Sequence, residues 1–500
     1  MNAMTEKFKI WYLYITVFAT GAAILIIEIL GTRVISPFYG TTIFVWSSLI
    51  IVTLSALALG YWLGGKIADR RPDVRIFYSL VLTAGIATSL IMKIDQPILV
   101  FADRFGFQFG PLVATFILFS VPLFLLGALT PFIVRLRMKL PERAGESSGN
   151  IFAIATLGSL AGALLAGFVL MPRFSLSAIF FFIAGFLIII AFAGLLMEKQ
   201  FAKNPTRILF LLLAFGFFAF PTLRYAEATT NNFEVLYAEP NFNSDLKIVK
   251  VGENICIAMD GALQTCKSTG SNGQLFSYFE ELKSIVSEKT YGDILILGSG
   301  GGAMLTLFAP DQRLDAVEIN PKMVVLGEQR LGFKAGPNQS IVIDDARNFL
   351  RKTDKKYDLV IMDVSKGFTI PSHLFAKEYF EILASHLNQN GVLAINFFGR
   401  TEPEDTLTAS VVKTLQTIFP NTAVAAPDIG LQNLLIFASF SDLSPVVSSL
   451  ATYREAKLNA KDGIVFTDDK NLSETLILPN LETLRNSLKG IGGFKLLFAN

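Results

Sequence analysis

One stretch decides the fold of the C-terminal half: Asp293-Ile294-Leu295-Ile296-Leu297-Gly298-Ser299-Gly300-Gly301-Gly302-Ala303. Four consecutive apolar residues followed by glycines predict a buried strand that runs into a loop able to approach a ligand closely. The apolar run 304–308 predicts the start of a helix, and a second strand over 314–319 carries Glu318. An acid about twenty residues after the first glycine can accept hydrogen bonds from ribose hydroxyls. This order of elements predicts a nucleoside-binding α/β domain.

The residues beyond this unit extend it into a doubly wound sheet. Further strands are expected over 340–343, ending at Asp344 and Asp345, over 357–362, ending at Asp363, and over 391–396. The carboxyl ends of parallel strands share one edge, where ligands bind in open α/β sheets. We therefore expect the acidic residues at these strand ends to line the site.

Upstream of the glycine loop the pattern is that of short strands, expected over 233–237, 246–251, 255–259 and 263–266, followed by a helix over 274–286. Asp260-Gly261 supplies a hairpin turn between the last two strands, and Cys256 and Cys266 flank it. A three-residue loop would place the two cysteines opposite each other, close to disulfide geometry. A two-residue loop would leave them one residue out of register, on opposite faces. Both alternatives stay open.

The first 225 residues have a different composition. The whole 500-residue chain is 52% hydrophobic and only 17% charged, whereas a soluble domain carries about 25% charged residues. Seven apolar segments near spanning length are expected over 10–30, 43–65, 76–92, 111–134, 151–171, 176–197 and 208–223. Small residues at helical spacing, such as Gly60, Gly64, Gly158 and Gly162, indicate close helix packing. We expect domains at 1–225 (transmembrane helices), 226–290 (β-hairpin subdomain) and 291–500 (nucleoside-binding domain).

Loop charges predict the orientation of the helices. The N-terminus and the loops 66–75, 135–149 and 198–207 hold thirteen Lys and Arg, and the opposite loops hold four. By the positive-inside rule the N-terminus is cytoplasmic. Seven spans would then put residues 226–500 on the outer side, where a disulfide persists. The short 208–223 segment holds Pro221, and if it does not span, the soluble half is cytoplasmic. The balance leans slightly to the outer, periplasmic side.

The soluble half resembles the spermidine synthase (polyamine aminopropyltransferase) family over roughly residues 245–400. The resemblance is carried by Asp260-Gly261-Ala262-Leu263-Gln264, Tyr278-Phe279-Glu280, the glycine loop, Val317-Glu318-Ile319, Ile343-Asp344-Asp345-Ala346, Asp363-Val364-Ser365-Lys366, Leu374-Phe375 and Tyr379-Phe380. The N-terminal half resembles bacterial membrane-integrated spermidine-synthase-like proteins, through Glu28 to Arg33, Pro37 to Gly40, Trp46, residues 60–70 and Thr467-Asp468-Asp469. The resemblance implies a Rossmann-like, class I S-adenosylmethionine-binding fold, a role in polyamine biosynthesis and a bacterial inner-membrane location.

By this resemblance, a sulfonium nucleoside, either S-adenosylmethionine or its decarboxylated form, is the co-substrate. The resemblance assigns to nucleoside binding Gln264, Gly298, Gly300, Gly302, Glu318, Asp345 and Ala346. It assigns to the reacting centre Asp363, Tyr278, Lys366 and Ser365. In the family an amine attacks the propyl carbon next to the sulfonium, and the enzyme mainly positions the reactants and helps deprotonate the amine.

The sequence departs from the family at two positions. The family carries aspartates where this chain has Gly301 and Lys366. Three interpretations follow. The protein transfers an aminopropyl or related alkyl group to an amine-type acceptor that is not a simple diamine; or it uses intact S-adenosylmethionine, for aminocarboxypropyl transfer, methyl transfer or cleavage to methylthioadenosine; or the soluble half is a catalytically silent nucleoside sensor or scaffold on a membrane carrier. The alternative to a role of Lys366 in any of these reactions is that it is a solvated loop lysine.

The expected partners are the nucleoside, an unidentified acceptor and the lipid bilayer. Two His, two Cys and no metal-ligand spacing predict no metal site. A net charge of +2 without a basic stripe predicts no nucleic-acid partner. His373, in the loop after Asp363, either lines the pocket or has no role. A homo-oligomer is left open.

Overall fold

The computed structural model describes residues 2–40, 42–137, 144–197, 233–240, 245–259, 262–268, 276–365, 370–402, 405–427 and 432–489. The chain divides into two compact units, one formed essentially by residues 1–226 and one by residues 227–498.

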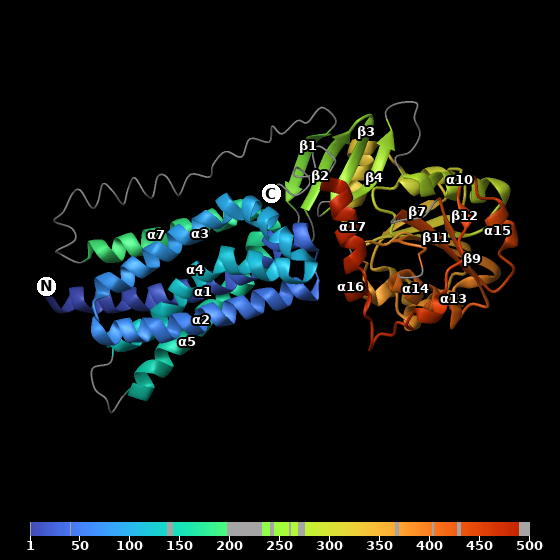
Figure 1. Cartoon of the computed structure of the whole chain (residues 1–500). Coiled ribbons are helices and arrows are strands. Elements are labelled where there is room, and N and C mark those ends of the chain that lie inside the picture. Colours follow the sequence, from blue (N-terminus) through green and yellow to red (C-terminus); the bar gives the residue numbers. More distant parts are fainter. Residues whose placement is uncertain are drawn as a thin grey trace. The chain divides into compact units, whose positions relative to one another are not determined.

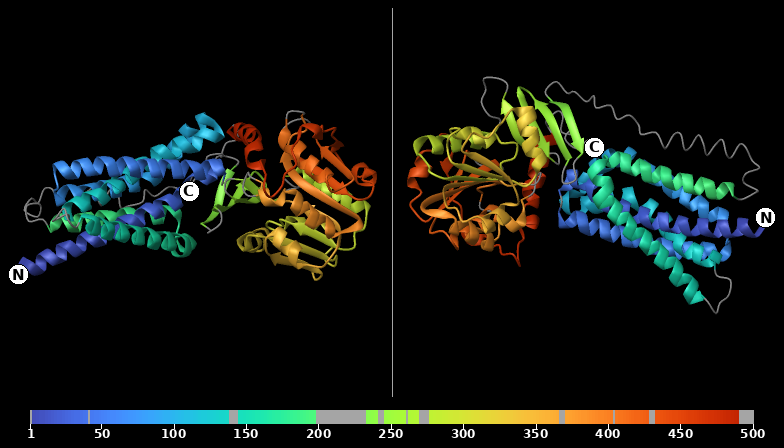
Figure 2. Two further views of the ribbon diagram at one scale, coloured as in Figure 1. Left: turned by 90° about the horizontal axis from the view of Figure 1, so that it is seen from below. Right: turned by 180° about the vertical axis from the view of Figure 1, so that it is seen from behind.

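The first unit is a bundle of long apolar helices lying side by side (Figures 1 and 2). Its principal helices are α1 (Asn2–Tyr39), α2 (Ile43–Arg70), α3 (Val74–Ala102), α4 (Gly106–Arg137), α5 (Ala144–Leu164) and α7 (Leu176–Leu196). A π-turn, η3 (Leu165–Leu170), continues α5 into the short α6 (Met171–Arg173). Six of the seven expected spans therefore coincide with helices, and the seventh, 208–223, lies outside the described residues.

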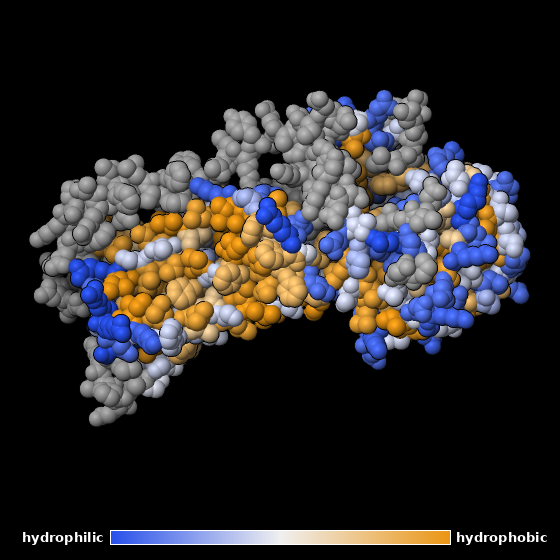
Figure 3. Space-filling model, viewed as in Figure 1, coloured by the Kyte–Doolittle hydropathy of each residue, from blue (hydrophilic) through white to orange (hydrophobic). Residues whose placement is uncertain are grey.

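Within the described residues, five helical stretches are long and apolar enough to cross a membrane. One of them, Val74–Arg137, has 64 residues and comprises α3 and α4, joined by the short turn η1 (Asp103–Phe105) and packed against each other. Gly106 has φ +70°, a backbone conformation that favours glycine and ends this turn. Apolar side chains such as Trp46, Ile50 and Leu54 are exposed on the bundle. Figure 3 shows a largely hydrophobic surface over the helices on the face in view. Such a surface is typical of helices solvated by lipid.

Small residues bring the helix backbones of the first unit together. A Cβ at Gly158 would clash with the carbonyl of Phe18, and one at Gly162 would clash with that of Ala22, so α5 lies directly on α1. A Cβ at Gly64 would lie 2.6 Å from the Cα of Ala128, which joins α2 to α4 in the same way. Lipid tails are as apolar as the helices, and close backbone packing therefore drives association. The interpretation of these glycines as packing residues is confirmed.

The second unit contains two sheets. The smaller has the order β1-β2-β3-β4, formed by β1 (Phe233–Pro240), β2 (Asp245–Val251), β3 (Asn254–Met259) and β4 (Ala262–Ser268). The larger has the order β12-β10-β11-β9-β8-β5-β6-β7. Its parallel strands are β5 (Ile294–Leu297), β6 (Leu314–Glu318), β7 (Gln339–Ile343), β8 (Tyr357–Met362) and β9 (Leu387–Gly399); β10 (Asn421–Ala426), β11 (Gln432–Ser439) and β12 (Arg454–Glu455) complete it. This is the mixed sheet of a Rossmann-like, methyltransferase-type domain, as expected.

The order of the parallel strands reverses between β5 and β8, which lie next to each other at the centre of the sheet. Ligands of open α/β sheets bind outside the carboxyl ends of the strands at this switch point. The glycine loop follows β5, and Asp363 follows β8. The topology therefore brings both sequence motifs to one place.

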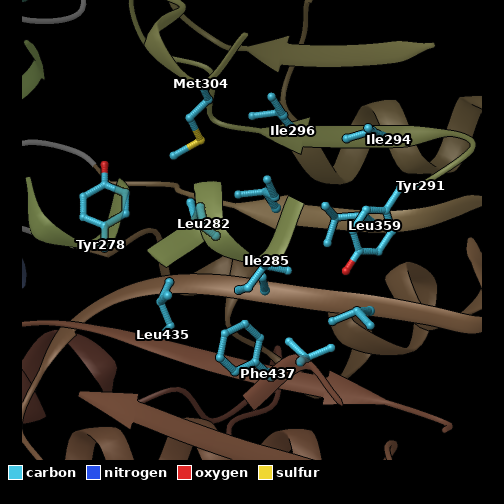
Figure 4. Close-up of a cluster of buried hydrophobic side chains, with 14 of the residues drawn as sticks. Tyr278, Leu282, Ile285, Tyr291, Ile294, Ile296, Met304, Leu359, Leu435 and Phe437 are labelled. Atoms are coloured by element: carbon cyan, nitrogen blue, oxygen red, sulfur yellow. The ribbon is translucent and has the colours of Figure 1, made fainter. Parts of the chain in front are cut away.

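Alternating strand residues build the main core of the second unit (Figure 4). Ile294 and Ile296 of β5 and Leu435 and Phe437 of β11 point to one face of the sheet, where α10 (Ser277–Glu288) packs. The buried residues Tyr278, Phe279, Leu282 and Ile285 recur at helical spacing and form the packed side of α10. The remaining helices of this unit are α11 (Pro321–Leu326), α12 (Ala346–Lys352), α13 (Lys377–Ser385), α14 (Thr406–Gln416), α15 (Ser444–Ser448), α16 (Ser473–Leu476) and α17 (Leu478–Lys489).

The smaller sheet is attached to the larger one by a second core. Leu246, Ile248 and Ile257 of the smaller sheet pack against Met323 and Leu326 of α11. The expected helix at 304–308 is instead a single 3-10 turn, η4 (Ala303–Leu307). Phe308 is extended, and Pro310 disfavours helical conformation at the residue before it, so the turn is not continued.

The register of the β3–β4 hairpin resolves the alternatives left open for the cysteines. Met259 pairs with Ala262, so the loop has two residues, and these lie outside the described part of the chain. Gln264 is an extra residue in β4, because Ala258 pairs with Leu263 while Ile257 pairs with Thr265. This bulge shifts the register by one, so that Cys256 lies opposite Cys266 and the two form a disulfide.

Candidate functional site

The glycine loop forms the floor of the site. Gly298, Gly300 and Gly302 have φ of +84°, +55° and +92°, in the left-handed region that favours glycine. A Cβ at Gly298 would clash with the carbonyl of Asp363, so the ends of β5 and β8 can meet only because this residue is glycine. The three glycines assigned from the sequence therefore shape the loop that crosses the carboxyl edge.

Glu318 lies at the end of β6 and faces this loop. Its Oε2 accepts a hydrogen bond from the N–H of Gly300 at 2.7 Å, and its Oε1 accepts one from the N–H of Asn320 at 2.9 Å. The residue is 7% exposed. Burial raises the pKa of Glu318 to about 7, although the two backbone hydrogen bonds act in the opposite direction. Its carboxylate is thus poised to exchange a proton, or to accept hydrogen bonds from a polar ligand, near neutral pH.

Asp363 and Tyr278 meet at the opposite side of the glycine loop. The Tyr278 hydroxyl donates a hydrogen bond to Asp363 Oδ2 at 3.0 Å, and Asn396 Nδ2 donates to Oδ1 at 2.8 Å. Burial raises the pKa of Asp363, and these two hydrogen bonds lower it. Burial and the neighbouring Asp363 raise the pKa of Tyr278 well above its usual value, so Tyr278 stays a hydrogen-bond donor. Asp363 can therefore act as a general base while the Tyr278 hydroxyl stays hydrogen-bonded to it.

The β3–β4 hairpin reaches the glycine loop from the smaller sheet. The bulged Gln264 accepts a hydrogen bond through Oε1 from Ser365 Oγ at 3.0 Å, and Thr265 Oγ1 accepts one from the N–H of Gly301 at 2.9 Å. A Cβ at Gly301 would lie 2.8 Å from Ile257 Cδ1 and 3.1 Å from Thr265 Cγ2. The hairpin therefore occupies the space into which a side chain at position 301 would point.

Asp345 lies at the end of β7 and caps helix α12. Its Oδ1 accepts from the N–H groups of Arg347 and Asn348, both at 3.0 Å, and its Oδ2 lies 2.9 Å from His373 Nε2. Ala346 is the first residue of α12 and is buried. His373 therefore contacts a residue that the resemblance assigns to nucleoside binding.

The side chains of Arg347 and Asp468 join α12 to a segment further along the chain. Arg347, 9% exposed, donates two hydrogen bonds to Asp468, at 2.7 and 2.6 Å. Arg347 holds the pKa of Asp468 below its usual value. The segment Thr467-Asp468-Asp469, which lies about 120 residues further along the chain, is thus held against α12.

The structure therefore gathers most of the predicted site residues at one edge of the sheet. Lys366 lies outside the described residues. Sequence reasoning did not single out Thr265 and Asn396, which contact Gly301 and Asp363. Asn396 carried a usable signal, because it lies near the end of the next strand after Asp363, whereas Thr265 comes from a hairpin that no local pattern directs to this edge.

The geometry also fits a polar nucleoside. Among the described residues, the buried hydroxyls of Ser299, in the glycine loop, and of Tyr379 have no hydrogen-bond partner within the protein. Buried polar groups are nearly always paired, and a ligand with hydroxyl and amino groups would supply partners. Within the described part of the chain, no cluster of three or more His, Cys, Asp or Glu could hold a metal ion.

The fold defines the class: a Rossmann-like, methyltransferase-type α/β domain with a candidate ligand site at its switch point. Residues 276–447 match the spermine/spermidine synthase domain family. Polyamine aminopropyltransferase 2 of Aquifex aeolicus is 26% identical over 429 residues, covering 81% of this chain and 82% of that protein. These matches confirm the resemblance to the spermidine synthase family that the sequence motifs predicted, over residues 276–447 for the domain family and over most of the chain for the Aquifex protein.

Other relatives match shorter parts. The polyamine aminopropyltransferase of Vibrio vulnificus is 31% identical over 118 residues, covering 22% of this chain and 40% of that protein. The crystal structure of a probable spermidine synthase from Corynebacterium glutamicum aligns with a TM-score of 0.40 at 18% identity, covering 47% of this chain and 95% of that chain. The chain thus spans less than half the length of the Vibrio relative and most of the Aquifex one.

Proposed function

We propose that the protein is a membrane-integrated transferase that moves an aminopropyl or related alkyl group from a sulfonium nucleoside to an amine-type acceptor. One observation carries the proposal: the partly buried carboxylate of Asp363, which accepts a hydrogen bond from Tyr278, lies across the glycine loop from Glu318. A nucleoside held by Glu318 and the loop would present its sulfonium side chain toward Asp363.

Each residue has a role in this reaction. Glu318 accepts hydrogen bonds from the ribose hydroxyls, Asp345 accepts one from the adenine amino group, and Gln264 lies beside the sulfonium side chain. The acceptor nitrogen attacks the carbon next to the sulfonium sulfur. A carbon–nitrogen bond forms, the carbon–sulfur bond breaks, and its electron pair stays on sulfur, which leaves as the neutral thioether of methylthioadenosine. Asp363 takes the proton that the nitrogen loses, with Tyr278 hydrogen-bonded to it.

Position 301 favours a second candidate. Spermidine synthases carry a carboxylate there that holds the donor's amine, whereas here the hairpin residues Ile257 and Thr265 fill that space. The neighbouring groups Thr265, Gln264 and Ser365 are neutral. We therefore keep as the alternative a reaction on intact S-adenosylmethionine, either methyl transfer or cleavage to methylthioadenosine, for which the positive charge of Lys366 would suit the donor's carboxylate.

The test is product formation by the purified full chain. Decarboxylated or intact S-adenosylmethionine is supplied with and without a panel of amines, from monoamines and amino acids to putrescine and spermidine, and methylthioadenosine and S-adenosylhomocysteine are measured. Methylthioadenosine that appears only with amine supports transfer. Its release without amine supports cleavage, and S-adenosylhomocysteine supports methyl transfer. No turnover of either nucleoside overturns the enzymatic proposal in favour of a silent nucleoside-binding domain. Asp363→Asn is the control, with an expected rate loss of about 10²- to 10⁴-fold.

We further propose that the helical unit lies in a bacterial inner membrane with its N-terminus in the cytoplasm and the second unit on the outer side. The excess of basic residues in alternate loops and the Cys256–Cys266 disulfide support this orientation. A cysteine introduced at the exposed Ser448 and treated in intact cells with a membrane-impermeant maleimide tests it. Labelling before lysis supports the outer side, and labelling only after lysis overturns it.

A further inference from the structure

We propose that Asn396 and Asn433 are positioning residues that hold Asp363 in its carboxylate form, ready to take a proton from the acceptor. The proposal rests on the proposed function and deepens it, because it assigns two residues that no motif of the glycine loop or of the Asp363 segment includes. It is carried by a chain of hydrogen bonds across three neighbouring strands.

The first link follows from the sheet register. Met362 of β8 is the parallel partner of Ile395 in β9, so Asp363 comes to lie beside Asn396. Asn396 Nδ2 donates to Asp363 Oδ1 at 2.8 Å, while Tyr278 occupies Oδ2. Each carboxylate oxygen therefore receives one hydrogen bond from the protein and keeps lone-pair capacity for a further donor.

The second link fixes which way the amide of Asn396 faces. An asparagine side chain can present either its NH₂ group or its oxygen to a neighbour. Asn433 Nδ2 donates to Asn396 Oδ1 at 2.8 Å, so the oxygen is engaged and the NH₂ group is turned to Asp363. Leu435 of β11 is the cross-strand partner of Asn396, and Asn433, two residues away, is its diagonal neighbour on the same face.

The third link holds Asn433 itself. The Tyr453 hydroxyl donates to the backbone oxygen of Asn433 at 3.0 Å and lies 3.0 Å from Ser277 Oγ. Ser277 immediately precedes Tyr278 in α10. The hydrogen-bond network therefore leads back to Tyr278, which is the other donor to Asp363. The two donors are thus connected through one network rather than set independently.

The network opposes protonation of Asp363, because the hydrogen bonds from Asn396 to Oδ1 and from Tyr278 to Oδ2 both lower its pKa. A proton on Oδ1 would face the NH₂ hydrogens of Asn396, which cannot accept it, so a proton has to go to Oδ2 and displace the hydrogen bond that Tyr278 donates there. The described titratable groups that face Asp363 are Tyr278 from α10, with Tyr453 behind it, and Glu318 from β6, whose negative charge opposes that of Asp363. Burial raises the pKa of Asp363, and the fixed amide counteracts this effect. If Asn433 is removed, Asn396 can turn its oxygen to Asp363 and accept a hydrogen bond from the protonated acid.

The chain offers a matched control in the same two strands. Asn388 of β9 donates through Nδ2 to Asp358 Oδ1 of β8 at 2.7 Å. This pair lies toward the amino ends of the two strands, away from the glycine loop. Asn388→Leu therefore removes an equivalent hydrogen bond from the same sheet without touching the site.

The experiment measures kcat for methylthioadenosine release as a function of pH, at saturating decarboxylated S-adenosylmethionine and a saturating amine that supports release, so that titration of Glu318 in the free protein does not enter. Asn433→Leu is expected to move the acidic limb upward by about one to two pH units, the equivalent of one hydrogen bond to a charged group, and to leave the rate at high pH nearly unchanged. Asn388→Leu leaves the limb where it is in the unaltered protein. An unmoved limb in Asn433→Leu, or an equal loss of rate at every pH, overturns the proposal.

A readout without turnover separates this proposal from the proposed function. The infrared carboxyl band of Asp363, assigned by its loss in Asp363→Asn, is titrated in the full chain. Its midpoint should rise in Asn433→Leu, and in Asn433→Ala if the leucine variant unfolds, but not in Asn388→Leu. If the unaltered protein releases no methylthioadenosine from any donor, the proposed function fails, and the infrared midpoints still decide the role of the asparagines. An unchanged infrared midpoint in the Asn433 variants overturns the role proposed for Asn396 and Asn433.

Discussion

Gly298→Ala tests whether the close approach of β5 and β8 builds the site. The substitution has two costs. Gly298 has φ +84°, and a left-handed conformation costs about 1–2 kcal/mol for a residue with a Cβ. The new Cβ would also lie 2.8 Å from the carbonyl carbon of Asp363, which belongs to backbone and cannot rotate away. Overpacking of this kind costs about 1–3 kcal/mol. We expect a total loss of about 2–5 kcal/mol in the free energy of unfolding of the second unit.

Gly252→Ala is the matched control for this prediction. Gly252 has φ +59° and nothing within 4 Å of the position of a Cβ. It therefore bears the conformational cost without the clash. Loss of unfolded-state entropy acts in the opposite direction by about 0.4–1 kcal/mol in both variants and cancels in the comparison. The two variants should differ by about 1–3 kcal/mol.

The assay is urea unfolding of the full chain in detergent, with pulse proteolysis reporting on the second unit and linear extrapolation giving the free energy. All three tryptophans, Trp11, Trp46 and Trp62, lie in the helical unit, so their emission shows independently that this unit is intact. Gly298→Ala should also weaken nucleoside binding, since the clash displaces Asp363. Equal destabilisation by Gly298→Ala and Gly252→Ala would refute the close-approach reasoning.

Three further predictions concern other parts of the second unit. Because the pKa of Glu318 is about 7 and ribose hydroxyls pair best with its ionised form, calorimetric affinity for S-adenosylmethionine should rise between pH 6 and 8. Glu318→Gln should abolish this pH dependence, and a persisting rise would contradict the assignment. Asp468→Asn leaves Arg347 without its charged partner and should lower the free energy of unfolding by about 1–3 kcal/mol; loss of nucleoside binding without loss of stability would show that the pair acts otherwise. Paired Cys256→Ser and Cys266→Ser substitutions, which remove a cross-link over a sequence separation of 10, should lower it by about 2–3 kcal/mol in urea unfolding, and an unchanged midpoint would count against the disulfide.

The site could be predicted from sequence where it depends on strand ends. Gly298, Glu318, Asp345 and Asp363 each stand directly at or after an apolar run, and parallel strands bring such positions to one edge whatever their order. Asn433 could not be predicted, because it reaches the site from β11, which runs antiparallel to β9. The residues around Asn433 do not indicate that β11 pairs with β9.

The cysteines show the same division in a single hairpin. The Asp260-Gly261 turn predicts a hairpin, and a two-residue loop alone would have put Cys256 and Cys266 on opposite faces. The extra residue Gln264 restores the register and at the same time reaches Ser365. A bulge is fixed by packing of the whole sheet, so the turn sequence could not indicate it.

The two-part organisation, the apolar helices, the strand–glycine-loop unit and the acids at its edge could be predicted, because these follow from hydrophobic periodicity and from glycine's freedom at positive φ. How those acids are held depends on contacts between elements that lie far apart along the chain. Thr265 accepts a hydrogen bond from Gly301, and Asp363 accepts one each from Tyr278 and Asn396. Asn433 donates to the amide oxygen of Asn396 and so orients its NH₂ group toward Asp363. These contacts join residues between 33 and 85 positions apart. Their physical cause is the order and register of strands, which a linear pattern does not contain.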